Sequence, residues 1–405
     1  MTAVPCWAQV CGPLAGYAEG FRAELERLGY TPLTAAVHVR LMAHVSRWLA
    51  REGLEASELS PAVVDAYFAE RRAVGYVGHV TGRALRPLVS YLRRLGVVVD
   101  PVPVAPASPV ERLLARYRHW QLIERGLTET TAELNMRLVR PFLLDRLGAR
   151  DGELDLEQLR AGEVTVFVVA YGQARPRSVK RMVSALRSLL GFLHVEGITD
   201  RPLATAVPSV AGWRQTGLPK ALDADQVSAV LACCDEGTAT GRRDLAILTL
   251  LSRMGLRAGE VAALRLDDID WRRGEIIVRG KGGRCARLPL PADVGERIVA
   301  YLVDGRPVAA QGRAVFVRAQ APYRPLRSNA VTTVVVWAAR RAGVGLVGAH
   351  RLRHSAATAM LRSGGSLIEI GQVLRHVRPL TTALYAKVEI EALRQLAQPW
   401  PGELA

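Results

Sequence analysis

Two segments rich in proline and glycine divide this chain of 405 residues, and they limit its fold to separate domains in series. Residues 100–109 contain four prolines in ten positions, and residues 205–220 combine prolines and glycines with little apolar periodicity. Such segments interrupt helices and strands and are typical of linkers. The sequence therefore predicts an N-terminal domain over residues 1–103, a second domain over 108–205, a linker over 206–219 and a third domain over 220–405.

Apolar residues at helical spacing predict that the first two domains are helical bundles. Residues 1–20 are expected to be a loose lead-in. Helices are expected from Thr34, from Pro61 after a serine that can cap it, and from Gly82 to Leu95 before a terminating glycine.

The second domain repeats part of the pattern of the first. Leu85, Leu88, Tyr91, Leu92 and Gly96 are echoed by Leu186, Leu189, Phe192, Leu193 and Gly197, roughly one hundred residues later. A duplication would explain this agreement, and so would coincidence between two small helical bundles.

The charge of the chain favours a polyanionic partner. Lysine and arginine number 54 and aspartate and glutamate 38, which gives a net charge of +16. Such an excess favours phosphate contacts, so nucleic acid is the leading partner and a solvated basic surface is the alternative. The basic residues expected to contact DNA in the second domain are Arg175, Arg177, Lys180, Arg181 and Arg187. The spacings of Arg177 with Arg181 and of Lys180 with Arg187 would place each pair on one helical face.

The five cysteines form no Cys-x-x-Cys pair, so reduced thiols are expected and no structural metal. No apolar run of 18 residues occurs, and the start of the chain lacks a basic region followed by an apolar run. These features predict a cytoplasmic, nucleoid-associated protein with no membrane partner. No acidic cluster for divalent metals is apparent, and no cofactor is expected.

The third domain is expected to open with a helix capped by Asp223, because Asp223-Ala224-Asp225-Gln226 resembles a capping box. The next helix should be buried, because residues 244–253 are nearly all apolar. It is followed by Gly255-Leu256-Arg257-Ala258-Gly259-Glu260, which would hold an arginine rigidly near the surface. Residues 275–279 and 284–290 predict a β-hairpin whose tip carries Lys281, with Arg284 as a further candidate for DNA contact.

The last feature is a cluster of imidazoles and cations ahead of one phenol. His350-Arg351-Leu352-Arg353-His354 is followed by His376 and by Tyr385, the last tyrosine of the chain. These motifs, in this order after the glycine-flanked arginine and the hairpin lysine, resemble those of the tyrosine recombinase (phage integrase) family. The resemblance covers residues 218–398, and the preceding bundles only in pattern.

The resemblance implies a mainly helical protein with a small β-hairpin or sheet, in which SAM-like core-binding bundles precede an α+β catalytic domain. It implies that Arg257 and Arg353 clamp the phosphate, with Glu260 in support. Lys281 would be the general acid and Tyr385 the nucleophile. His350 and His376 match the two imidazole positions of the family, whereas His354 is expected to be structural.

The expected reaction is site-specific recombination through a 3′-phosphotyrosyl intermediate, without metal or ATP. The expected partner is double-stranded DNA, bound by a homo-oligomer, a dimer on a site and a tetramer in synapsis, or by a hetero-assembly of related recombinases. Two alternatives stay open: a type IB topoisomerase-like nicking-closing enzyme, and a catalytically silent DNA-binding subunit of a multi-recombinase complex.

Overall fold

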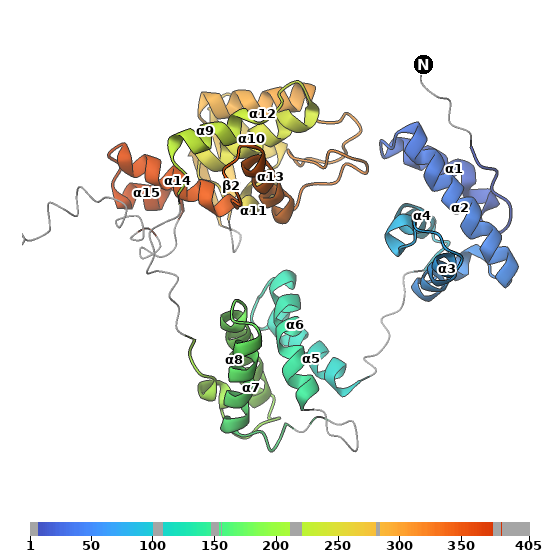
Figure 1. The fold of residues 1–405 in the computed structure, drawn as a ribbon, viewed down its shortest axis with the longest axis horizontal. Helices are drawn as coiled ribbons and strands as arrows, with labels where there is room; N and C mark the ends of the chain where they lie inside the picture. Colours follow the sequence, from blue (N-terminus) through green and yellow to red (C-terminus); the bar gives the residue numbers. More distant parts are fainter. Residues whose placement is uncertain are drawn as a thin grey trace, which may run out of the picture. The chain divides into compact units, whose positions relative to one another are not determined.

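The computed structural model describes residues 7–99, 108–146, 154, 156–210, 221–280, 284–375 and 382. The chain divides into two compact units, one of Pro101–Thr216 and one of Met1–Asp100 with Gly217–Ala405. The described residues within 7–99, 108–210 and 221–375 each form a hydrophobic core of their own. The helices of each range are labelled in Figure 1. None of the helices in the described part of the chain is both long and apolar enough to cross a membrane.

The N-terminal bundle is built from helices whose ends follow local signals. Its elements are η1 (Ala15–Tyr17), α1 (Ala18–Arg27), α2 (Pro32–Glu52), η2 (Ala56–Glu58), α3 (Pro61–Ala73) and α4 (Gly82–Arg94). The Ser60 side chain accepts a hydrogen bond from the N–H of Val63 at 3.3 Å, which confirms the predicted start of α3. The expected loose lead-in is wrong for its described part. Leu14 is fully buried, and its N–H donates to Oγ of Ser46.

The second bundle repeats this order of helices. Its elements are α5 (Pro109–Ile123), α6 (Glu129–Asp145), α7 (Ala161–Ala174), α8 (Val179–Val195) and η3 (Leu203–Ala206). The residues that agree in sequence occupy similar places, since Gly96 and Gly197 follow α4 and α8 with φ values of 72° and 69°. Leu203 and Val207 are buried in the core of this bundle, so the chain before residue 208 packs with it rather than forming a free linker. A common origin of the two bundles stays a prediction.

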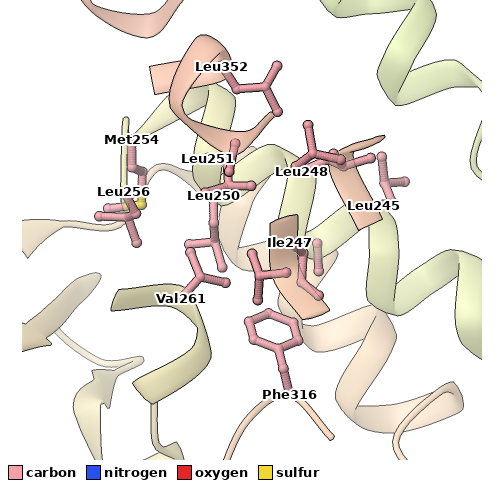
Figure 2. Packing of buried hydrophobic residues seen from close by; sticks show 14 of the residues in the cluster. Leu245, Ile247, Leu248, Leu250, Leu251, Met254, Leu256, Val261, Phe316 and Leu352 are labelled. Atoms are coloured by element: carbon pink, nitrogen blue, oxygen red, sulfur yellow. The ribbon is translucent and has the colours of Figure 1, made fainter. Parts of the chain in front are cut away.

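The third region surrounds one buried helix. Its helices are α9 (Ala224–Ala232), α10 (Ala239–Arg253), α11 (Ala258–Ala263), α12 (Ala292–Asp304), α13 (Ser328–Arg341), α14 (Ala349–Arg362) and α15 (Leu367–Val373), with η5 (Leu266–Asp268) after α11. Residues 245–251 of α10 are all buried, as their composition predicts, and α9, α12, α13 and α14 pack against this helix. Figure 2 shows Leu250 and Leu251 of α10 close to Val261 and Leu352.

A small antiparallel sheet lies beside α11 and has the strand order β1 (Ile269–Asp270), β2 (Glu275–Arg279) and β3 (Cys285–Pro289). Ile276 pairs with Ile269 on one side and with Leu288 on the other. The N–H of Gly280, just after β2, donates to the carbonyl of Arg284, just before β3, at 2.7 Å and so extends the pairing of the two strands toward the hairpin tip. The predicted β-hairpin is therefore confirmed over the described residues, whereas Lys281 lies outside them.

Candidate active site

The end of α10 provides the first fixed point of the site. Gly255 follows the helix with φ of +60°, a conformation that glycine adopts without steric cost. A Cβ atom at this position would lie 2.5 Å from Cδ2 of Leu374, which follows α15. The Gly255 carbonyl accepts a hydrogen bond from Nη1 of Arg353 at 2.5 Å. Glycine is thus required both for the turn and for the close approach of two distant segments.

Arg257 and Glu260 form a reciprocal pair at the start of α11. The backbone N–H of Arg257 donates to Oε2 of Glu260 at 2.8 Å, and Nη1 of Arg257 donates to Oε1 at 2.7 Å. The Glu260 side chain is 4% exposed, whereas that of Arg257 is 44% exposed. A carboxylate that caps a helix N-terminus also meets its positive dipole end. Glu260 therefore fixes the base of an arginine whose guanidinium stays accessible.

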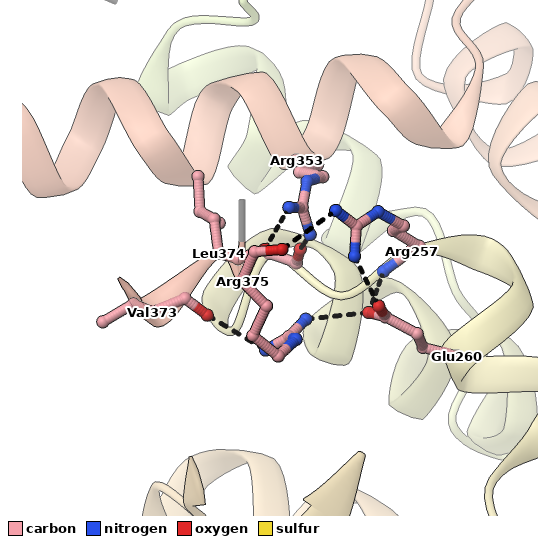
Figure 3. Close-up of polar contacts among 7 residues, drawn as sticks. Arg257, Glu260, Arg353, Val373, Leu374 and Arg375 are labelled. Atoms are coloured by element: carbon pink, nitrogen blue, oxygen red, sulfur yellow. Dashed lines mark hydrogen bonds and ion pairs between the residues drawn. The ribbon is translucent and has the colours of Figure 1, made fainter. Parts of the chain in front are cut away.

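Arg353 lies on α14 and is one of the largest fully buried side chains of the described residues, at 2% exposure. Its Nη1 atom donates a hydrogen bond to the Gly255 carbonyl, and its Nη2 atom donates to the carbonyl of Leu374. Figure 3 shows the guanidinium between the end of α10 and the turn that follows α15. Arg257 reaches the same turn, because its Nη2 atom donates to the Arg375 carbonyl at 3.4 Å. Two predicted phosphate ligands from distant parts of the sequence thus meet at one turn.

Arg375 belongs to this cluster and is not among the residues predicted from the sequence. Its Nη2 atom donates to Oε2 of Glu260 at 2.7 Å, and its Nη1 atom to the Val373 carbonyl at 3.0 Å (Figure 3). Its side chain is 14% exposed. The signal that could have identified it is weak: a basic residue just after a short amphipathic segment and just before His376.

The charges of the cluster act on one another. Burial acts to raise the pKa of Glu260, but the N–H of Arg257 and the charges of Arg375 and Arg257 outweigh it, so this pKa is below its ordinary value. Burial lowers the pKa of Arg375, and Glu260 opposes this effect. The carboxylate is therefore held ionised between two guanidiniums.

The two histidines of α14 stack edge to face, with ring centroids 4.4 Å apart. His350 is exposed on the first turn of the helix. Partial loss of solvent, followed by the charges of Arg353 and Arg257, lowers the pKa of His350. Burial, followed by the charges of His350 and Arg353, lowers the pKa of His354 to about 4. Both imidazoles are accordingly neutral at pH 7, and a neutral imidazole can accept a proton.

Some of the predicted site residues are not placed by the described part of the chain. Lys281, His376 and Tyr385 are outside the described residues. Arg284 is exposed at the β-hairpin. The structure thus brings together Arg257, Glu260, His350 and Arg353.

The basic stretch of the second bundle is exposed, but its geometry differs from the prediction. The side chains in question are those of Arg175, Arg177, Lys180, Arg181 and Arg187. Arg177 lies in the turn before α8, so the helical-spacing argument for its pairing with Arg181 is wrong. Arg187 donates to the Val207 carbonyl at 2.9 Å and thereby holds the end of η3.

The fold is that of the tyrosine recombinases. The XerH site-specific recombinase in complex with the palindromic difH substrate aligns with a TM-score of 0.54 and 18% identity, over 74% of this chain and 99% of that one. A lambda integrase dimer bound to a COC′ core site aligns with a TM-score of 0.52 and 18% identity, over 67% and 93% of the chains. These likenesses define the class, a DNA recombinase fold.

Sequence comparison gives the family. Residues 220–391 match the model of the phage integrase family. The y4rA protein of Sinorhizobium fredii, whose name marks it as a candidate integrase/recombinase, is 40% identical over 97% of this chain and 96% of its own length. The tyrosine recombinase XerD of Mycobacterium tuberculosis is 33% identical over 69% of this chain and 93% of its own length. The chain therefore belongs to the phage integrase family of tyrosine recombinases, enzymes that cleave and rejoin DNA strands.

Proposed function

We propose that this protein carries out site-specific recombination with Tyr385 as the nucleophile and Arg257 and Arg353 as the phosphate ligands. The observation that carries the proposal is the convergence of both arginines on the turn of residues 374–375, immediately before His376 in the chain. A phosphodiester under attack gains charge on its non-bridging oxygens, and rigidly held guanidiniums stabilise that charge. The buried carboxylate of Glu260 supplies the rigidity on the side of Arg257.

The protons of the reaction can be assigned to residues of this chain. A phenol has a pKa near 10, so neighbouring cations and a proton acceptor are needed at neutral pH. His350 is neutral because its pKa is lowered. It accepts the phenol proton of Tyr385 as the bond between the Tyr385 oxygen and phosphorus forms. The bond from phosphorus to the 5′-oxygen breaks, and Lys281 protonates that leaving oxygen. His376 contributes a hydrogen bond to the phosphate. The 3′-phosphotyrosyl link conserves bond energy, so a second 5′-hydroxyl can reverse the step without ATP.

Double-stranded DNA is the proposed substrate, bound by a homo-oligomer. Relatives in the same fold class were solved as a dimer on a core site and as a tetramer on a Holliday junction, with TM-scores of 0.52 for both. By analogy we assign a dimer to one site and a tetramer to synapsis, with a hetero-assembly of related recombinases as the other arrangement. A nucleoid-associated protein in the cytoplasm fits this substrate.

The domain limits and the N-terminal bundle are part of the proposal. We assign DNA or partner binding to residues 1–103, core DNA binding to 108–205 and catalysis to 220–405. The exposed cations of the second bundle and Arg284 are the proposed DNA contacts. The y4rA protein of Sinorhizobium fredii aligns with this chain over almost its full length, including the first bundle. This supports a role for the first bundle that the two proteins share.

Covalent capture tests the proposed function. Wild type and Tyr385→Phe are expressed with the native host DNA and denatured, and any DNA attached to the protein is sequenced. We expect adducts at one or a few sites in wild type and none in the variant. Adducts scattered without sequence preference would indicate a topoisomerase-like enzyme. The absence of adducts, with DNA binding kept and after addition of related recombinases, would indicate a silent subunit.

A further inference from the structure

Arg375 has an unusual backbone conformation for an arginine. It follows α15 with φ of +55°, and the described part of the chain has only one other non-glycine residue with positive φ, His79. The left-handed conformation after a helix is usually taken by glycine or asparagine, because a Cβ atom is unfavourable there. A long cationic side chain at this position therefore needs a compensating interaction.

The side chain of Arg375 provides that interaction inside the cluster described above. Both of its terminal nitrogens are used, one by Glu260 and one by the Val373 carbonyl. Its Nε atom is buried and has no hydrogen-bond partner. Leaving a buried donor unpaired is unfavourable. The ion pair with Glu260, rather than a complete set of hydrogen bonds, therefore holds the Arg375 side chain in place.

The same residue connects the two arginines of the proposed mechanism. Oε2 of Glu260 accepts from Nη2 of Arg375 and from the backbone N–H of Arg257. The carbonyl of Arg375 in turn accepts from Nη2 of Arg257, and the carbonyl of the preceding Leu374 accepts from Arg353. The contacts form a closed ring from Arg257 through Glu260 and Arg375 back to Arg257. A shift of Arg375 would thus move both phosphate ligands.

We propose that Arg375 is a positioning residue for DNA cleavage. Through its ion pair with Glu260 and the turn in which it lies, it aligns Arg257 and Arg353 with each other. The proposal rests on the proposed function, because it assigns a role in the same reaction. The proposal gives Arg375 no contact with the phosphate, because it acts through its bonds to Glu260 and to the Val373 carbonyl.

The test compares Arg375→Gly, Arg375→Lys and the control Arg297→Gln. Glycine suits the left-handed turn and removes the ion pair, so this variant should fold. Lysine keeps a charge that can reach Glu260. The control removes an ion pair with Glu236 on the exposed surface of the same region. Single-turnover adduct formation is measured on the captured DNA site, and the dissociation constant is measured for the same DNA.

We expect Arg375→Gly to bind the DNA within roughly threefold of wild type and to form the adduct roughly tenfold to a hundredfold more slowly, as misalignment predicts. Arg375→Lys should recover most of the rate, and the control should match wild type. Wild-type rates in Arg375→Gly would overturn the proposal. Equal loss of DNA binding and cleavage, with no recovery by lysine, would do the same and would indicate a purely structural role.

A second measurement does not depend on catalysis. Phenylglyoxal modification of Arg353, mapped by mass spectrometry, reports whether the turn after α15 still covers this side chain, which is 2% exposed in the native protein. We expect faster modification in Arg375→Gly and an unchanged rate in the control. If wild type forms no adduct that requires Tyr385, the proposed function fails. The protection of Arg353 then decides separately whether Arg375 positions this turn, and unchanged protection in Arg375→Gly would refute the inference.

Discussion

Replacement of Glu260 by glutamine should destabilise the third region, and the size of the effect follows from burial. Glutamine keeps the shape of the side chain and one oxygen to cap α11, but it removes the charge that faces Arg257 and Arg375. Arg257 is 44% exposed, so the loss of its pair costs less than about 1 kcal/mol. Arg375 is 14% exposed and would remain as a buried, unpaired cation, which costs about 3 kcal/mol.

Hydrogen exchange measured by mass spectrometry can follow this loss in the full-length protein. Amides of α10 report opening of the third region, because residues 245–251 form the centre of its core. Since about 1.4 kcal/mol corresponds to a factor of ten, their protection at pH 7 should fall by a factor of roughly 100 in Glu260→Gln. Glu236→Gln is the control, since it breaks an exposed pair with Arg297 and should leave protection nearly unchanged.

The pH dependence of the protection gives an independent check that the ionised carboxylate of Glu260 stabilises the fold. The pKa of Glu260 in the folded protein lies below its ordinary value of 4.5, so its contribution is complete above that pH and is lost as the pH falls through the folded pKa. The difference between wild type and Glu260→Gln should therefore shrink in acid. Protection in Glu260→Gln within twofold of wild type at pH 7 would refute the argument that the carboxylate compensates a buried arginine.

Three further predictions concern neighbouring residues. Arg353→Lys replaces the planar guanidinium, whose two terminal nitrogens each bond one carbonyl, by a single ammonium. Thermal unfolding should therefore show a loss of about 1–3 kcal/mol, and an unchanged midpoint would contradict this. Gly255→Ala should lower the unfolding midpoint more than the control Gly343→Ala. Both positions have positive φ, but only at Gly255 would the new Cβ meet another side chain, and equal effects would exclude the steric contact as the cause. His354 has a folded pKa of about 4 against an ordinary 6.5, so wild type should lose stability as the pH falls from 6.5 to 4. The variant His354→Gln should lose less stability in pH-dependent melting, and identical profiles would argue against a partly buried neutral imidazole.

Local signals in the sequence determined much of the fold. Prolines and capping residues marked the start of helices such as α3 and α9, where Ser60 and Asp223 accept hydrogen bonds from the first turn. The apolar run of α10 identified the buried helix, and two strand-like runs on either side of a glycine-rich turn identified the hairpin. These features depend on contacts within a few residues or on burial alone, so they can be read without knowledge of distant neighbours.

The motifs around Arg257 and Arg353 also pointed to the family and to most of the candidate site, but only the tertiary structure decided how these residues are held. Nothing local shows that Arg353 is buried between the end of α10 and the turn after α15, or that Gly255 must lack a Cβ because Leu374 lies against it. The contact of Arg375 with Glu260, which is distant in the sequence, identifies Arg375 as a member of the cluster. The physical reason is that a buried ion pair is specified by both partners and by the burial around them, and only the folded chain brings these together.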